Sequence, residues 1–161
     1  MASVDYFLKI DGVEGESADE KHSGQIELIS WSWSESNIGT HASGGGGGAG
    51  KVSMEDFSCS MYACKATPIL MLYCASGQHI PSVTLTCRKA GGEQQEFLIV
   101  KFSECHISAY STSGSTGDVV PTDTISINFA KIEFEYKPQL PDGTLGSAVT
   151  AGWDLKKNKK V

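Results

Sequence analysis

Apolar and polar residues alternate along most of this chain with a period of two, which is typical of half-buried β-strands. Between the alternating stretches lie short segments rich in Gly, Pro, Ser and Asp, which favour turns. The alternating stretches cover residues 4–10, 25–34, 51–61, 83–88, 97–107, 123–136 and 153–155. The pattern therefore predicts a mainly β protein with about seven strands.

Three of the longer stretches change phase partway along. In the second stretch, Ile26 and Leu28 share one parity, whereas Ile29, Trp31 and Trp33 share the other. A β-bulge near the change would place all five side chains on one face and would bend the strand. Similar changes of phase lie between Met54 and Phe57 and at Phe129–Ala130. Long bent strands favour a bulged, closed β-barrel of two curved antiparallel sheets.

One short α-helix is predicted at Thr67–Ser76, where the sequence reads TPILMLYCAS. Thr67 suits the N-cap, Pro68 suits the first helical position, and Gly77 suits the left-handed residue that ends a helix. Ten residues are too few for a helix that is stable alone, and this one is apolar on every side. We therefore expect one side to pack on the sheet and another to be covered by a loop or a second subunit.

Composition narrows the range of functions. A chain of 161 residues with 40% apolar and 20% charged residues is expected to form a single globular domain over 1–161. The net charge of −6 excludes nucleic acid as the main partner, although residues 156–161 contain four lysines and are expected to form a flexible basic tail. Residues 37–50 form an extended Gly-rich loop in this interpretation. No stretch is apolar enough for membrane insertion, and the N-terminus lacks the features of a cleaved signal peptide.

The candidate chemical motifs do not predict catalysis. GGGGAGK at residues 45–51 resembles a phosphate-binding loop, but Val52 stands where Ser or Thr must bind Mg²⁺, and a strand follows instead of a helix. The four histidines are scattered, and the five cysteines contain no CxxC pair, so neither a metal site nor a disulfide framework is indicated. We expect no catalytic, cofactor-binding or metal-binding residues, and we predict that the protein is not an enzyme.

Several segments together resemble the haemolysin-coregulated protein (Hcp) family, the tube subunit of type VI secretion systems. The matching segments are YFLKIDGVEGES (6–17), WSW (31–33), GGGGGAGKV (44–52), ATPILM (66–71), RKAGGEQQEFLI (88–99) and NFAKIEFEYKPQ (128–139). The resemblance implies hexameric rings that stack into a secreted tube and carry small effector proteins in the lumen. It also implies a tip spike protein and a contractile sheath as partners, and a cytoplasmic location before the tube is fired from the cell.

Within that interpretation, two groups of residues become candidates for contact. Small polar residues opposite the tryptophans are candidates for the lumen wall, namely Ser30, Ser32 and Ser34. Residues of the Gly-rich loop and the helix are candidates for contacts between subunits or rings, namely His41, Gly44, Gly45, Gly46, Gly47, Gly48, Lys51, Leu70 and Met71. The alternative is a monomeric β-barrel that binds a small ligand in its interior, and the many aromatic residues on the strands argue against an empty interior.

Overall fold

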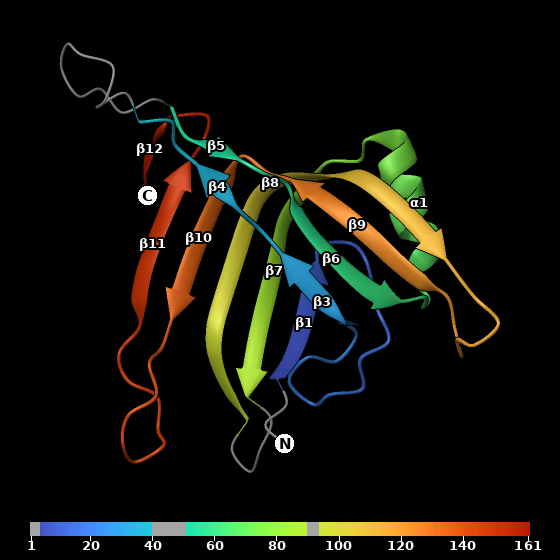
Figure 1. Ribbon diagram of the computed structural model, residues 1–161, viewed down its shortest axis with the longest axis horizontal. Coiled ribbons are helices and arrows are strands. Elements are labelled where there is room, and N and C mark those ends of the chain that lie inside the picture. The colour runs from blue at the N-terminus through green and yellow to red at the C-terminus, as the bar shows by residue number, and fades with distance from the viewer. Residues whose placement is uncertain (1–3, 40–50, 90–93) are drawn as a thin grey trace.

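The computed structural model describes residues 4–39, 51–89 and 94–161, in which twelve strands surround a core beside one helix (Figure 1). The first six strands are β1 (Val4–Ile10), β2 (Ile26–Glu27), β3 (Ser30–Ser32), β4 (Glu35–Ser36), β5 (Ser53–Met54) and β6 (Phe57–Tyr62). After the helix α1 (Thr67–Ser76) follow β7 (Ile80–Lys89), β8 (Gln95–Ser113), β9 (Thr122–Asn128), β10 (Lys131–Tyr136), β11 (Val149–Asp154) and β12 (Lys159–Lys160). All strand pairs are antiparallel, as predicted.

The strands form two curved sheets that share β8. The larger sheet has the order β12-β11-β10-β8-β7-β1-β2, and the other sheet has the order β3-β6-β9-β8. The first part of β8 pairs with β7 and β10, and the part from His106 onward pairs with β9. The strand bends between these parts, where Glu104 has φ = 55° and the register with β9 shifts between Ile107 and Ala109.

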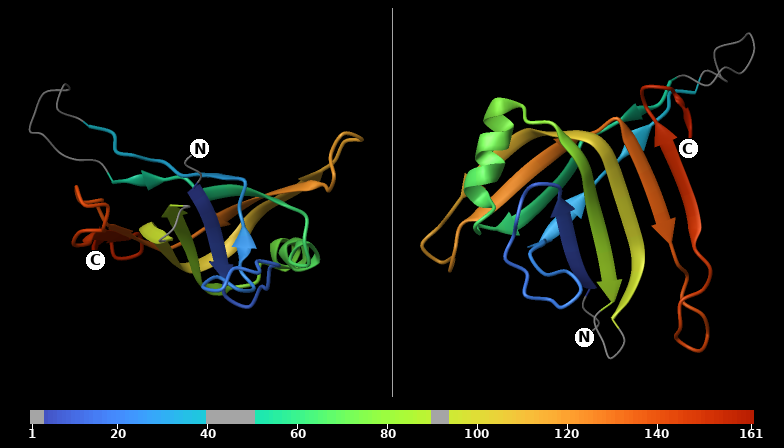
Figure 2. Two further views of the ribbon diagram at one scale, coloured as in Figure 1. Left: turned by 90° about the horizontal axis from the view of Figure 1, so that it is seen from below. Right: turned by 180° about the vertical axis from the view of Figure 1, so that it is seen from behind.

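The two sheets also join through residues 26–32, which closes the barrel. The Leu28 N–H donates to Tyr6 O of β1 at 2.9 Å, and the Ile29 N–H donates to Ser60 O of β6 at 2.8 Å. Hydrogen bonds therefore continue from β1 through β2–β3 to β6, β9, β8, β7 and back to β1, which confirms the predicted closed barrel. Beyond the barrel, β10–β12 extend the larger sheet to one side, and β4–β5 form a separate ribbon (Figures 1 and 2).

The three changes of phase mark places where a strand ends, which corrects the prediction of a bulge at each. The breaks lie between β2 and β3, β5 and β6, and β9 and β10. At two of them the chain passes from one sheet to the other. The predicted inward orientation fails for Ile29, which is 43% exposed, whereas Ile26 is buried and both tryptophans pack against the core.

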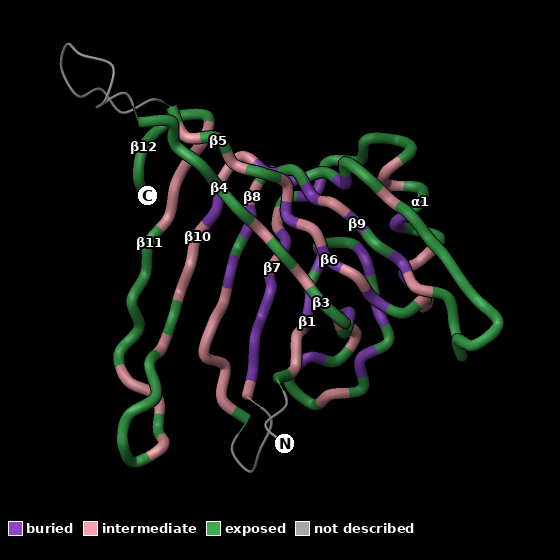
Figure 3. The backbone as a smooth tube through the Cα atoms, in the orientation of Figure 1, coloured by how far each residue is buried: buried purple, intermediate pink, exposed green. Residues whose placement is uncertain are grey.

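Apolar side chains fill the barrel interior. Four aromatic rings follow one another across it, with centroid separations of 6.2 Å from Trp31 to Phe57, 4.9 Å from Phe57 to Phe102 and 4.9 Å from Phe102 to Phe129. Figure 3 shows buried residues concentrated in the barrel strands and exposed residues along much of β11 and β12. The filled interior contradicts the alternative prediction of a ligand cavity inside the barrel.

The helix has the predicted bounds, but its first residue, Thr67, is not the N-cap that the sequence predicted. Gly77 ends it with φ = 67°, as predicted. The N-cap is Ala66, and no side chain caps the helix. Thr67 Oγ1 instead accepts from the Cys64 N–H at 3.0 Å and donates to Asp123 Oδ2 of β9 at 2.6 Å. In the part of the chain that the structure describes, no helix has the length and hydrophobicity needed to cross a membrane.

The C-terminal segment is an ordered hairpin, which corrects the prediction of a flexible tail at 156–161. Strand β12 pairs with Trp153 and Asp154 of β11. The Lys157 N–H donates to Asp154 Oδ1 at 2.9 Å, and the Val161 N–H donates to Gly152 O at 3.0 Å. The lysines of this segment are therefore presented on a fixed turn and strand.

Candidate functional site

The predicted lumen residues Ser30 and Ser32 belong to a surface of small hydroxyl side chains on the outside of the smaller sheet. Strand register places Ser30 opposite Ser60, and Ser60 opposite Thr124. In the next row, Ser32 lies opposite Ser58, and Ser58 opposite Ser126. We call Ser30, Ser32, Ser58, Ser60, Thr124 and Ser126 the hydroxyl face. It covers three adjacent strands without a charged side chain among its members.

Hydrogen bonds between neighbouring strands fix parts of this face. Ser30 Oγ lies 2.6 Å from Ser60 Oγ, and Ser58 Oγ lies 3.1 Å from Ser126 Oγ. The sequence prediction missed the members on β6 and β9. Their signal was present, because serine and threonine alternate with buried Phe, Cys, Met and Ile in both strands. Alternation alone does not show which residues of neighbouring strands lie side by side, so the full surface could not be predicted.

The third predicted lumen residue, Ser34, lies at the edge of the hydroxyl face in a hollow of about 480 Å³. Residues that line this hollow are Ser32, Trp33, Ser34, Met54, Glu55, Asp56, Ser58 and Ser126. Asp56 accepts hydrogen bonds from Ser108 Oγ at 2.5 Å and from Asn128 Nδ2 at 2.9 Å, which fixes its carboxylate at the rim. The structure therefore brings all three predicted serines to one polar surface.

The residues predicted to contact neighbouring subunits or rings do not form one surface, unlike the three serines. His41 and Gly44–Gly48 lie outside the described residues. Lys51 is exposed, and so is Met71 at 51%. Leu70 is fully buried within the chain and packs in the core, so it is not available to a neighbouring subunit. On the helix, the exposed apolar side chains are those of Ile69, Met71 and Leu72.

An apolar groove lies between the β4–β5 ribbon and the strands β10 and β11, and its volume is about 800 Å³. Aromatic and aliphatic side chains form its walls, and polar side chains of Glu35, Ser36, Asn37, Lys51 and Asn158 lie along it. Its aromatic lining residues are Trp33, Phe134 and Trp153. The sequence pattern did not predict this groove, because its walls come from strands far apart in the chain.

A cluster of charged residues around the buried Arg88 attaches the loop 14–24 to the barrel. The Arg88 side chain is 3% exposed and donates to Asp19 Oδ1 at 3.0 Å, to Asp19 Oδ2 at 2.7 Å and to Asp5 Oδ2 at 3.0 Å. Its guanidinium also lies over the Phe7 ring, 4.7 Å from the centroid. The hydrogen bonds from Arg88 lower the pKa of Asp19 to about 2. These bonds have a structural explanation, since they join β1, β7 and the loop.

A histidine and two cysteines in the barrel also have structural explanations. His22 stacks on Phe7 with centroids 4.4 Å apart, and its Nε2 lies 2.7 Å from Glu96 Oε1. Burial raises the pKa of both Cys87 and Cys105 to about 12, so these thiols stay protonated and unreactive at neutral pH. Over the described ranges, no group of three or more His, Cys, Asp and Glu side chains is placed to hold a metal ion.

The geometry thus defines a filled β-barrel whose notable features are exposed surfaces suited to contact with other molecules. Comparison with known proteins agrees. Residues 7–136 match the protein family described as "Type VI secretion system effector, Hcp". The chain belongs to this Hcp family.

Similarity to individual members extends over nearly the whole chain. Protein hcp1 of Pseudomonas aeruginosa is 46% identical over 158 residues, which are 97% of this chain and 98% of that protein. A solved structure titled "Structure of a type six secretion system protein" has a TM-score of 0.94 at 33% identity and covers 99% of this chain and 100% of that one. Hcp1 of Salmonella typhimurium has a TM-score of 0.81 at 38% identity, with 100% of both chains covered.

Proposed function

We propose that this protein is the structural tube subunit of a type VI secretion system. In this proposal, six copies form a ring, the rings stack into a tube, and small effector proteins travel in the lumen. The protein acts by assembly and carriage instead of catalysis. Family membership supports the role in secretion, and the hydroxyl face is the observation that supports a lumen wall on the smaller sheet.

The chemistry of the hydroxyl face suits weak binding of varied cargo. Short hydroxyl side chains offer hydrogen-bond donors and acceptors without a large apolar or charged anchor. A surface of this kind discriminates little between partners, because specificity requires groups that penalise the wrong one. Cargo would therefore bind and leave readily, as a carrier requires.

The proposal includes partners and a location that follow from the family. The partners are further copies of the chain, effector proteins, a spike protein at the tube tip and the contractile sheath. The subunit is made in the cytoplasm and then leaves the cell with the tube, without removal of a signal peptide.

Light scattering coupled to size exclusion, at two concentrations in reducing buffer, tests the ring. We expect a mass near that of six subunits. A stable monomer at both concentrations would contradict assembly by the chain alone.

The substitution Ser32→Gln tests the lumen wall, because it places a longer side chain on the hydroxyl face, beside Ser58. Ser76→Gln at the exposed end of α1 is the matched control. When each variant is co-expressed with an effector, Ser32→Gln is expected to reduce the retained and protease-protected effector at least about tenfold, a loss of roughly 1.4 kcal/mol in binding. Equal retention by both variants would refute the assignment of this face.

A further inference from the structure

The connection between β8 and β9 is an ordered projection with an apolar tip. The Asp118 N–H donates to Ser115 O at 3.0 Å, and Ser115 Oγ donates to Asp118 Oδ2 at 3.0 Å, so the turn is fixed by its own hydrogen bonds. Val119 directly follows this turn and is 99% exposed. Val120 is also exposed. We call residues 114–121 the valine tip.

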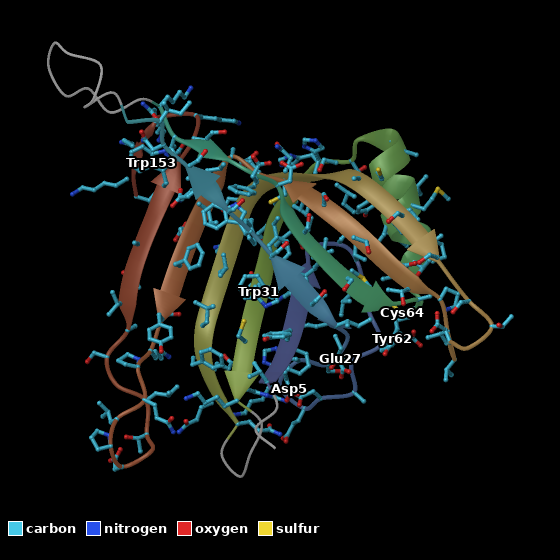
Figure 4. All side chains as sticks on the ribbon, viewed as in Figure 1. Asp5, Glu27, Trp31, Tyr62, Cys64 and Trp153 are labelled. Carbon is cyan, nitrogen blue, oxygen red and sulfur yellow. The ribbon has the colours of Figure 1, made fainter. Side chains whose placement is uncertain are left out.

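The valine tip and the apolar groove lie at opposite ends of the molecule. In Figure 1 the tip projects at the right end of the long axis, and β10–β12 with the β4–β5 ribbon occupy the left end; both views of Figure 2 agree. Figure 4 shows the same separation in side chains, with Trp153 of the groove far from Tyr62, which pairs with Thr122 next to the tip. No chain of this shape can place its own tip in its own groove.

The chemistry of the groove matches that of the tip. The groove has apolar walls, and Trp153 Nε1 is buried there without a hydrogen-bond partner among the described residues. Lys51 and Glu35 both line the groove, and the hairpin β11–β12, which carries Lys157, Lys159 and Lys160, borders it through Asn158, so lysine side chains are available at its rim. The tip provides two exposed valines, backbone carbonyl acceptors and the carboxylate of Asp118.

We propose that the valine tip of one subunit inserts into the apolar groove of the next subunit. This inference rests on the proposed ring and identifies its contact. Two different patches at opposite ends of one chain form a heterologous interface, which generates a closed ring when the rotation per subunit closes. Val119 and Val120 pack against Trp33, Phe134 and Trp153, and Asp118 pairs with lysine at the rim. The groove of about 800 Å³ has room for such a turn.

Site-specific photo-crosslinking tests the contact directly. A benzophenone side chain is incorporated at Val119 in the full chain, the sample is irradiated, and crosslinked peptides are identified by mass spectrometry. The expected result is a covalent dimer whose crosslinks fall on the groove residues Trp33, Met54, Phe134 or Trp153. The matched control has the same group at the exposed Ser76, which belongs neither to the valine tip nor to the groove lining, and is expected to give at least about fivefold less of this product.

Paired substitutions and light scattering separate the failure of this contact from the failure of the ring. Val119→Ser with Val120→Ser is expected to raise the concentration for half-assembly at least about tenfold, whereas Val149→Ser, which removes one exposed valine side chain outside the tip and the groove lining, is expected to leave it unchanged. Unchanged assembly of the double variant, or crosslinks to another surface in rings of normal mass, would overturn the contact while the ring stands. A wild-type chain that stays monomeric would overturn both the contact and the ring.

Discussion

Thr67 connects the helix to the barrel, and removal of its hydroxyl group is expected to destabilise the fold. Its Oγ1 donates to the fully buried Asp123 at 2.6 Å and accepts from the Cys64 N–H at 3.0 Å. Thr67→Val keeps the volume of the side chain and removes both bonds. Asp123 then retains a hydrogen bond from Tyr110 Oη at 3.3 Å.

The loss in the free energy of unfolding can be estimated from the polar groups that Thr67→Val leaves without hydrogen-bond partners. A buried acceptor without its donor costs about 1–3 kcal/mol, and a charged one costs more. Together with the orphaned Cys64 N–H, Thr67→Val is expected to lower the free energy of unfolding by about 2–4 kcal/mol. For a chain of this size the melting temperature then falls by roughly 5–15 °C.

Urea unfolding followed by circular dichroism measures this change, and Thr67→Ser is the matched control because it keeps the hydroxyl group. Both variants are compared at two protein concentrations, since assembly contributes to apparent stability. Thr67→Ser is expected to lose about 1 kcal/mol or less, the value of one methyl group. If Thr67→Val lies within about 0.5 kcal/mol of Thr67→Ser, the hydrogen bonds of the hydroxyl group do not stabilise the fold.

Two further predictions concern the charged cluster and the core. Because Arg88 lowers the pKa of Asp19 from 3.8 to about 2, the stability that Asp19 adds is fully present above about pH 4 and is lost as the pH falls toward 2. Asp19→Asn is therefore expected to flatten the fall in stability over that range, measured by urea unfolding; a wild-type slope in the variant would contradict the linkage. In the core, Phe57→Ala is expected to cost about 3–5 kcal/mol and Phe57→Leu clearly less by the same measurement, and a loss below about 1 kcal/mol for Phe57→Ala would refute the close packing of Phe57 on Phe102.

The sequence predicted the strands and the helix bounds because their signals are local. Alternation identifies a strand wherever one face is buried, and Gly77 ends the helix through its own φ of 67°. The role of Thr67 was wrong for the opposite reason. Its partner Asp123 is 56 residues away in sequence, and contact between the two exists only in the folded barrel.

The candidate surfaces also depend on contacts between residues that are distant in sequence, which local patterns do not predict. Alternation gave one edge of the hydroxyl face, Ser30 and Ser32, but the neighbours Ser58 and Ser126 join it only through strand register. A change of phase in a strand also has two physical solutions, a bulge or the start of a new strand, and both keep apolar residues inside. The sequence therefore located the corners of the barrel without predicting that the chain changes sheet at Leu28 and Ile29.

The exposed side of the helix links stability to assembly. Ten residues cannot hold a helix in water, and α1 buries only Leu70 completely, packing against β8 while Ile69, Met71 and Leu72 stay exposed. The Thr67–Asp123 hydrogen bond and the Gly77 cap therefore act together with the packing of Leu70, Tyr73 and Cys74 to hold this helix on the barrel. Neighbouring apolar side chains that a helix leaves exposed are typical of surfaces that a partner covers. A subunit or sheath that covers Met71 would stabilise the helix from its other side, and the helix would then be held by contacts both within and between chains.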